Sequence, residues 1–67
     1  MMIYHITVRA MRERFMEPAL IETLHYYVSA DSYEQARDCV FEMLNRGGWK
    51  PGTVTHEIVP LIDARVG

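Results

Sequence analysis

Hydrophobic and polar residues alternate in two stretches of the N-terminal half, residues 2–10 and residues 20–30. A period of two with β-branched and aromatic residues predicts half-buried strands. The apolar side of the two stretches consists of Met2, Tyr4, Ile6, Val8, Ala10, Leu20, Leu24, Tyr26, Val28 and Ala30, with Glu22 as an outlier. The two strands are therefore expected to pair as a hairpin that buries one face.

Residues 11–19, between the two stretches, are mixed in charge and include Pro18. Nine residues are too many for a tight turn. This segment is predicted to be either a flexible hairpin loop or an irregular extension of the two strands.

A helix is predicted over residues 32–46. Asp31 and Ser32 are both good N-cap residues, and either Asp31 with Glu34 or Ser32 with Gln35 would form a capping box. The apolar stripe at helical spacing consists of Tyr33, Ala36, Cys39, Val40, Met43 and Leu44. A Gly-Gly pair at positions 47–48 supplies the left-handed residue that ends a helix.

A turn at residues 49–52 and a last strand at residues 53–62 complete the chain. Pro60 lacks an N–H for a strand ladder, so this strand lies at an edge or ends near Val59. Residues 63–67 are expected to form a loose tail.

This order of elements, β-β-α-β, predicts a single small α+β domain spanning residues 1–67. The first strand should lie centrally in a three-stranded antiparallel-type sheet of order 2-1-3, with a right-handed crossover and the helix on one face. The expected helix-facing residues are Ile6, Val8, Leu24, Tyr26, Val28, Val54 and Ile58. Nothing in the chain is left to cover the opposite face.

Composition narrows the class of protein. The chain has 67 residues, of which 49% are hydrophobic and 24% are charged, as in globular domains rather than disordered ones. A domain of this length has a marginal core. The formal net charge of −2 argues against general nucleic-acid binding. A single cysteine, the absence of a signal-peptide pattern and the absence of a long apolar segment predict a cytoplasmic protein with no membrane contact.

The uncovered sheet face is the first candidate site. If Ala10 pairs with Leu20, His5 lies opposite His25, and two facing imidazoles would make the surface sensitive to pH near 6. Ile3, His5, Thr7, Arg9, Thr23, His25 and Tyr27 belong to this face. The face is either a solvated surface or a contact surface for a second copy or another macromolecule, because interfaces favour Tyr and Arg.

Neither a metal, a cofactor nor catalysis is predicted. The three histidines and Cys39 do not occur at metal-ligand spacing, and no nucleophile motif or phosphate-binding loop is present. Cys39 is expected to face the core and to be unreactive. We therefore expect a protein that is not an enzyme.

An acidic ridge along the helix is the second candidate site. It consists of Asp31, Glu34, Asp38 and Glu42, at steps of three and four. Like charges at this spacing repel. The ridge is either a solvated face that aids solubility or a surface that meets a basic groove of a partner.

The predicted loop is the third candidate site. It carries Arg12, Arg14 and Phe15, and Arg9 lies just before it. Loops often carry binding residues, and an exposed phenyl ring between arginines could anchor in a pocket or against nucleic acid. The alternative is that Phe15 folds back over the end of the sheet.

The sequence VSADSYEQA, residues 28–36, resembles a strand-to-helix junction of very small phage and mobile-element proteins. Anti-CRISPR proteins, which inhibit bacterial defence complexes by binding them, share this size, a sheet-plus-helix build and acidic patches. The resemblance implies a stoichiometric binder of a host complex and assigns no site residue.

Three functions follow as hypotheses. The first is a binding protein that occupies a larger protein or nucleoprotein complex, by steric block or by mimicry of phosphate charge. The second is a nucleic-acid-binding module that uses Arg9, Arg12, Arg14 and the Tyr27 face. The third is a homodimeric structural or regulatory subunit.

Overall fold

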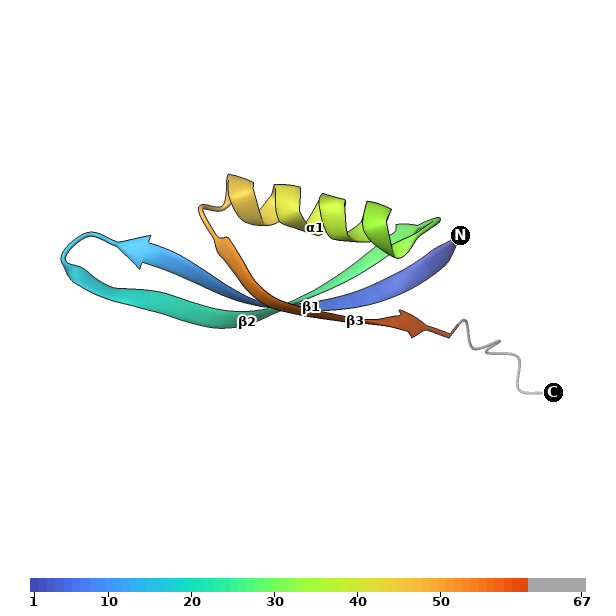
Figure 1. Ribbon diagram of the computed structural model, residues 1–67, viewed down its shortest axis with the longest axis horizontal. Coiled ribbons are helices and arrows are strands. Elements are labelled where there is room, and N and C mark those ends of the chain that lie inside the picture. The colour runs from blue at the N-terminus through green and yellow to red at the C-terminus, as the bar shows by residue number, and fades with distance from the viewer. Residues whose placement is uncertain (61–67) are drawn as a thin grey trace.

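A computed structural model describes residues 1–60 of the chain. Its elements are β1 (Met2–Arg14), β2 (Glu17–Ala30), α1 (Tyr33–Arg46) and β3 (Lys50–Val59). The strands form one antiparallel sheet in the order β2-β1-β3, and α1 lies over one face of it (Figure 1). The predicted α+β fold and strand order are confirmed. Residues 61–62 of the predicted last strand and the predicted tail at residues 63–67 lie outside the described residues.

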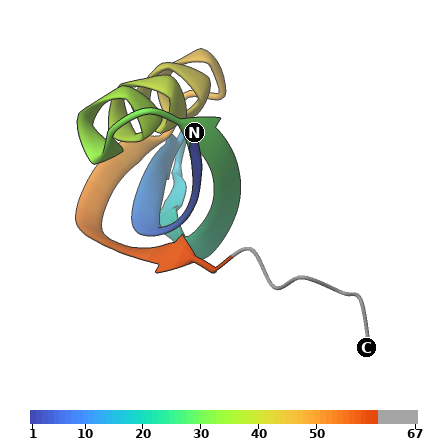
Figure 2. The same cartoon turned by 90° about the vertical axis from the view of Figure 1, so that its right-hand side faces the viewer.

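Two layers make up the domain, the helix and a strongly twisted sheet. The view along the molecule in Figure 2 shows α1 on one side of the strands, with β1 between the two outer strands. Within residues 1–60, no helix has both the length and the apolar character that crossing a membrane requires.

The β1–β2 hairpin is longer than the alternating stretches suggested. Both strands continue through the segment predicted as a loop, so the strand-extension alternative is correct, and only Phe15 and Met16 form the turn. The hairpin end projects beyond α1 and β3, as the light-blue end in Figure 1 shows. Met16 has a φ of 58°, in the left-handed region that bulky residues seldom adopt.

The hairpin register differs from the predicted one by two residues. Ala10 pairs with Glu22 rather than Leu20, and His5 pairs with Tyr27 rather than His25. Two features add up to this difference. The two-residue turn at Phe15 and Met16 moves the pairing by one residue, and a bulge moves it by one more, because β2 has one residue more than β1 between the pairs Arg14–Glu17 and Arg12–Leu20. An even shift keeps every side chain on its predicted face, because side chains alternate with a period of two.

The core is a narrow contact between one face of β1 and one line of α1. It consists of Tyr4, Ile6, Val8 and Ala10 from β1 and of Ala36, Val40 and Leu44 from α1. The three helix residues follow an i, i+4 line, so they contact the sheet directly. Cys39 and Met43, at the margin of this line, are exposed, and the prediction of a buried thiol is wrong. Ile58 is also 55% exposed rather than packed beneath the helix.

Both ends of α1 follow their predicted signals. Ser32 is the N-cap, and its hydroxyl accepts a hydrogen bond from the Gln35 backbone N–H at 3.3 Å. The Gln35 side chain accepts in turn from the backbone N–H of Asp31 at 3.2 Å. At the other end, Gly48 has a φ of 77° and turns the chain toward β3. Ser32 and Gln35 are therefore the pair that caps the helix, although Gln35 accepts from the residue before the N-cap and not from Ser32 itself.

β3 starts three residues earlier than predicted. The residues that were predicted to form a turn belong to the strand, because a bulge lets them pair with β1. Val54 pairs with Val8 and Pro51 with Ala10, so Gly52 and Thr53 together stand opposite Arg9. A Cβ on Gly52 would lie 2.8 Å from the Arg9 carbonyl oxygen, so a residue without a side chain is needed here. The strand ends at Val59, as the following proline predicts.

Candidate binding surface

The sheet face opposite α1 is uncovered by any element within residues 1–60 (Figure 2). Alternation and pairing place on it Ile3, His5, Thr7, Arg9 and Met11 of β1, Ile21, Thr23, His25 and Tyr27 of β2, and Thr53, Thr55, Glu57 and Val59 of β3. We call this surface the open face. The open face contains four of the predicted site residues, His5, Arg9, His25 and Tyr27.

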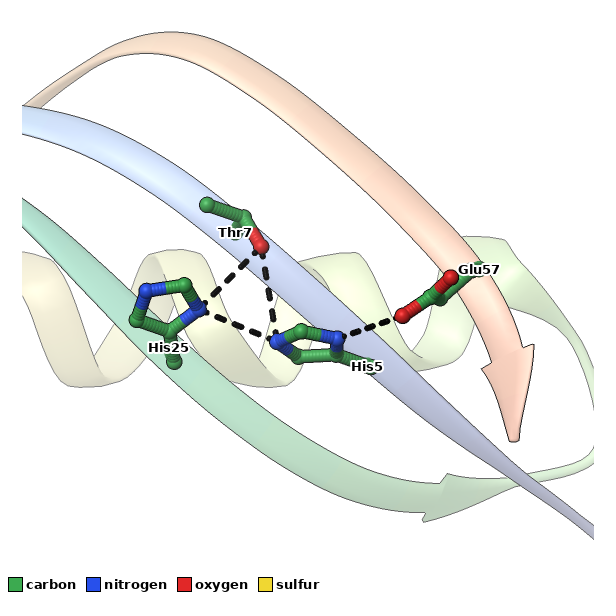
Figure 3. Close-up of polar contacts among 4 residues, drawn as sticks. All are labelled: His5, Thr7, His25 and Glu57. Atoms are coloured by element: carbon green, nitrogen blue, oxygen red, sulfur yellow. Dashed lines mark hydrogen bonds and ion pairs between the residues drawn. The ribbon is translucent and has the colours of Figure 1, made fainter.

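Two imidazoles meet at the centre of the open face (Figure 3). His5 Nε2 lies 3.0 Å from His25 Nδ1, and His5 Nδ1 lies 2.8 Å from a Glu57 carboxylate oxygen. The two rings are inclined by 26° and meet edge to edge, nitrogen toward nitrogen. The predicted proximity of the two histidines is correct, although His25 stands directly opposite Thr7 and reaches His5 diagonally.

The carboxylate sets the direction of the hydrogen bonds. An ionised Glu57 only accepts, so His5 Nδ1 carries the hydrogen and donates. In neutral His5 the other nitrogen, Nε2, is then an acceptor, and His25 must donate through its own Nδ1–H. The Thr7 hydroxyl lies 3.3 Å from His25 Nδ1 and 3.5 Å from His5 Nε2 and can rotate to suit either ring.

Full protonation of both imidazoles breaks this chain of hydrogen bonds. Each facing nitrogen then carries a hydrogen, and two N–H groups point at each other across the 3.0 Å contact. Glu57 from β3 is the carboxylate that faces His5, and Arg9 from β1 adds positive charge to the same face. The His5–His25 contact is therefore kept only while the pair holds at most one extra proton.

We predict that both histidines adopt the Nδ1–H tautomer at mildly alkaline pH. Long-range ¹H–¹⁵N NMR spectra should show the hydrogen on Nδ1 of His5 and of His25. Glu57→Gln is the control, because an amide can donate as well as accept and so removes the constraint on His5. A hydrogen on Nε2 of either ring in the unmodified protein would contradict the arrangement.

An aromatic ring lies against this cluster. Tyr27, directly opposite His5, stacks on the His5 ring with centroids 4.7 Å apart and planes inclined by 6°. The Tyr27 side chain is nevertheless 68% exposed. His5 itself is 18% exposed and is fixed at both ring nitrogens. Tyr27 is thus an exposed aromatic side chain held in one orientation by a rigid support.

The cluster has few of the features that a hydrolytic site needs. The backbone N–H groups of these strands lie in the plane of the sheet, so they do not point out of this face toward a bound oxyanion. A hollow of about 220 Å³ beside His5, Thr7, Thr55, His56 and Glu57 is smaller than common ligand pockets. Within residues 1–60, no three His, Cys, Asp or Glu side chains converge on a metal position.

The structure separates the predicted arginine patch. Arg9 lies on the open face, whereas Arg12 lies on the helix side of the hairpin. The Arg12 guanidinium donates to the Gly47 carbonyl oxygen at 2.6 Å and lies 4.3 Å from the centre of the Trp49 ring. Arg12 therefore fastens the end of α1 to the hairpin and is not available as a ligand-binding cation.

The hairpin end also differs from its predicted alternatives. Arg14 pairs with Glu17 at 3.1 Å and donates to the Pro18 carbonyl oxygen. Phe15 is 91% exposed and does not fold back over the sheet. Arg9, Arg12 and Arg14 therefore do not share one surface. Phe15 is exposed, which an aromatic anchor for a binding partner would require.

The acidic ridge is exposed along its whole length, as predicted. Its second half is locally neutralised: Glu42 pairs with Arg46 at 2.6 Å, and Asp38 lies 3.5 Å from Arg37. Exposed pairs of this kind are weak. They nevertheless halve the unpaired negative charge that the ridge could present to a basic partner.

One member of the cluster, Glu57, was missed by sequence reasoning. It lies opposite His5 on the neighbouring strand, 52 residues away in the chain. The alternation of residues 53–59 assigns it to the open face, but nothing in the sequence sets the β1–β3 register. A bulge at Gly52 shifts that register, so the pairing could not be counted out from the turn.

Comparison with known proteins finds no match: no family model, no curated protein and no solved structure resembles this chain closely enough to assign it. The interpretation of the open face therefore depends on its geometry.

Proposed function

We propose that the protein is a small non-catalytic binding protein that attaches to a larger protein or nucleoprotein complex through the open face. The observation that carries this proposal is Tyr27, an aromatic side chain that is exposed yet held flat on His5. Tyr is enriched among residues that dominate binding energy, and a side chain already fixed loses little conformational entropy on binding.

The neighbours of Tyr27 fit the anatomy of a protein interface. Ile21 is 54% exposed, and Ile3, Met11 and Val59 are half-buried on the same face. Arg9 and Glu57 supply polar groups beside this apolar surface. A mixture of an aromatic anchor, aliphatic contacts and polar groups is typical of protein–protein contacts.

We infer a steric mode of action, because Tyr27 and its apolar neighbours form an exposed surface. The protein would act by covering a surface of its partner in equal stoichiometry. Given the resemblance of residues 28–36, defence complexes of the CRISPR type are the first class of partner to test. The open face is preferred to the acidic ridge because the ridge is partly neutralised by Arg37 and Arg46.

The test is affinity capture of the tagged protein from nuclease-treated bacterial lysate, with mass spectrometry of what is retained. Tyr27→Ala should weaken partner binding by about 30-fold or more, which is the scale of a dominant interface residue. The matched control is the double reversal Asp38→Lys, Glu42→Lys, which changes the ridge and should leave capture intact.

The opposite pattern, with capture lost only in the ridge variant, would identify the acidic ridge as the binding surface in place of the open face. Recovery of nucleic acid alone, released by salt, would favour the nucleic-acid hypothesis. Because Tyr27 is exposed, its variant should unfold at nearly the same urea concentration as the unmodified protein, which separates binding from folding.

A further inference from the structure

Three atoms that can bind a metal ion converge at the centre of the open face, one each from His5, Thr7 and His25 (Figure 3). His5 Nε2 lies 3.0 Å from His25 Nδ1, and the Thr7 hydroxyl oxygen lies 3.5 Å from the first nitrogen and 3.3 Å from the second. Zn–N bonds of about 2.0–2.1 Å separate two ligands of a tetrahedral zinc ion by about 3.3–3.4 Å. The three atoms therefore already have nearly the mutual spacing of ligands around one such ion.

Glu57 holds His5 in the form that a metal ligand requires. Its carboxylate oxygen lies 2.8 Å from His5 Nδ1, so it keeps the ring hydrogen on that nitrogen and leaves the Nε2 lone pair free. Histidines that bind metals almost always donate their other ring N–H to a carboxylate, a carbonyl oxygen or water. Glu57 also supplies negative charge beside the three atoms. Arg9, two residues beyond Thr7 on β1, is exposed, so solvent screens its opposing charge.

We propose that His5 and His25 chelate a first-row transition-metal ion such as Zn²⁺, with the Thr7 hydroxyl as a further oxygen ligand. Imidazole nitrogens suit zinc, copper and nickel, whereas magnesium and calcium prefer oxygen ligands. Among residues 1–60 no third His, Cys, Asp or Glu joins the two imidazoles as a ligand. Water therefore completes the coordination on the solvent side, and the affinity is lower than at a four-ligand structural zinc site.

Binding requires one change in the His25 ring. In the metal-free protein Nδ1 of His25 carries the hydrogen that is donated to His5, whereas a ligand nitrogen must be unprotonated. That hydrogen leaves to water and Nε2 takes one up, so the imidazole stays neutral. His25 is exposed, so its ring can turn to direct the Nδ1 lone pair at the ion.

The metal site does not depend on the proposed partner binding, because the isolated chain supplies all of its protein ligands. The sequence did not indicate it, because His5 and His25 are 20 residues apart and only the hairpin register brings them together. A bound ion would hold the His5 ring at Nε2 while Glu57 holds it at Nδ1. The ring on which Tyr27 stacks would then be fixed at both nitrogens by stronger contacts.

Zinc titration of the isolated protein, followed by long-range ¹H–¹⁵N NMR, tests the site. The reference protein is Cys39→Ser, which removes the exposed native thiol as a competing ligand. At saturation with one Zn²⁺ per chain, the hydrogen of His25 should have moved to Nε2, while His5 keeps its hydrogen on Nδ1. Mg²⁺ should leave both rings unchanged. An unchanged His25 tautomer at saturating Zn²⁺, or one ion bound by two chains, would overturn the proposal.

Calorimetric titration of variants assigns the ligands. Loss of a group that only orients a metal ligand costs about 10–100-fold in affinity, so Glu57→Gln should weaken Zn²⁺ binding by about tenfold and His25→Ala by at least as much. The matched control is His56→Ala, because His56 is also an exposed histidine but stacks on Tyr33 on the helix side of the sheet. It should leave the affinity unchanged. Equal losses in His56→Ala and His25→Ala would show unspecific binding to surface imidazoles and would contradict the chelate.

Discussion

Replacing Ile6 by alanine is expected to lower the free energy of unfolding by about 2–5 kcal/mol, the range observed for large-to-small changes in well-packed cores. Ile6 is fully buried at the middle of the central strand, where β2 and β3 flank it and α1 covers it. A domain of this length has a total stability of roughly 3–10 kcal/mol. The change should therefore remove a large share of the total stability, and the variant should unfold at a much lower urea concentration, as titration followed by circular dichroism would show.

Ile58→Ala is the control for this change. It deletes the same atoms from a side chain that is 55% exposed on the same sheet face. The expected cost is at most about 1 kcal/mol, from lost strand preference and partial burial. Equal destabilisation by the two changes would show that the core is not confined to the β1–α1 contact.

Replacing Arg12 by alanine is expected to lower stability by about 1–3 kcal/mol and to leave partner binding unchanged. The change removes a charge-assisted hydrogen bond to the Gly47 carbonyl oxygen and a cation–π contact with Trp49. Trp49 is the sole tryptophan of the chain, so its fluorescence reports directly on the loosened end of α1.

Arg14→Ala is the matched control, because Arg14 is two residues away and its ion pair with Glu17 is exposed. Pairs of that kind contribute about 0–1 kcal/mol, so stability and Trp49 fluorescence should hardly change. If Arg12→Ala instead weakened nucleic-acid or partner binding without affecting unfolding, the assignment of Arg12 to the fold would be wrong.

The order of the elements, the faces of the strands and the start of the helix could all be predicted from the sequence. Each depends on local physics: alternation over residues 2–10 and 20–30, and a Ser32 hydroxyl three residues before Gln35. Strand order also followed, from a hairpin of the first two strands and a right-handed crossover that brings the last strand beside the first. These properties do not depend on long-range register.

Register, by contrast, could not be predicted, because two bulges set it. The turn position and a one-residue bulge next to it together displaced the hairpin pairing by two residues, and a bulge at Gly52 displaced β3. These register errors also affected the prediction of the candidate site. His5 and His25 were correctly brought together, but Tyr27 as the neighbour of His5 and Glu57 as its hydrogen-bond acceptor came only from the structure.

The second source of error was the direction in which a side chain points from a helix or a hairpin. Cys39 belongs to the apolar stripe by spacing, yet the twisted sheet contacts α1 along one line only, and position 39 falls beside it. Arg12 looked like a binding cation because its partners, Gly47 and Trp49, are 35 or more residues away. Contacts between distant segments are not visible in a periodic pattern.

The central position of β1 has a consequence for how the chain folds. The β1–β2 hairpin and α1 depend on local contacts, whereas β3 must find a strand near the other end of the chain, pairing Val59 with Ile3. Closing so long a loop is entropically costly and slows folding. We expect the hairpin to form early with one edge of β1 unpaired, and the arrival of β3 to be the step that limits the folding rate.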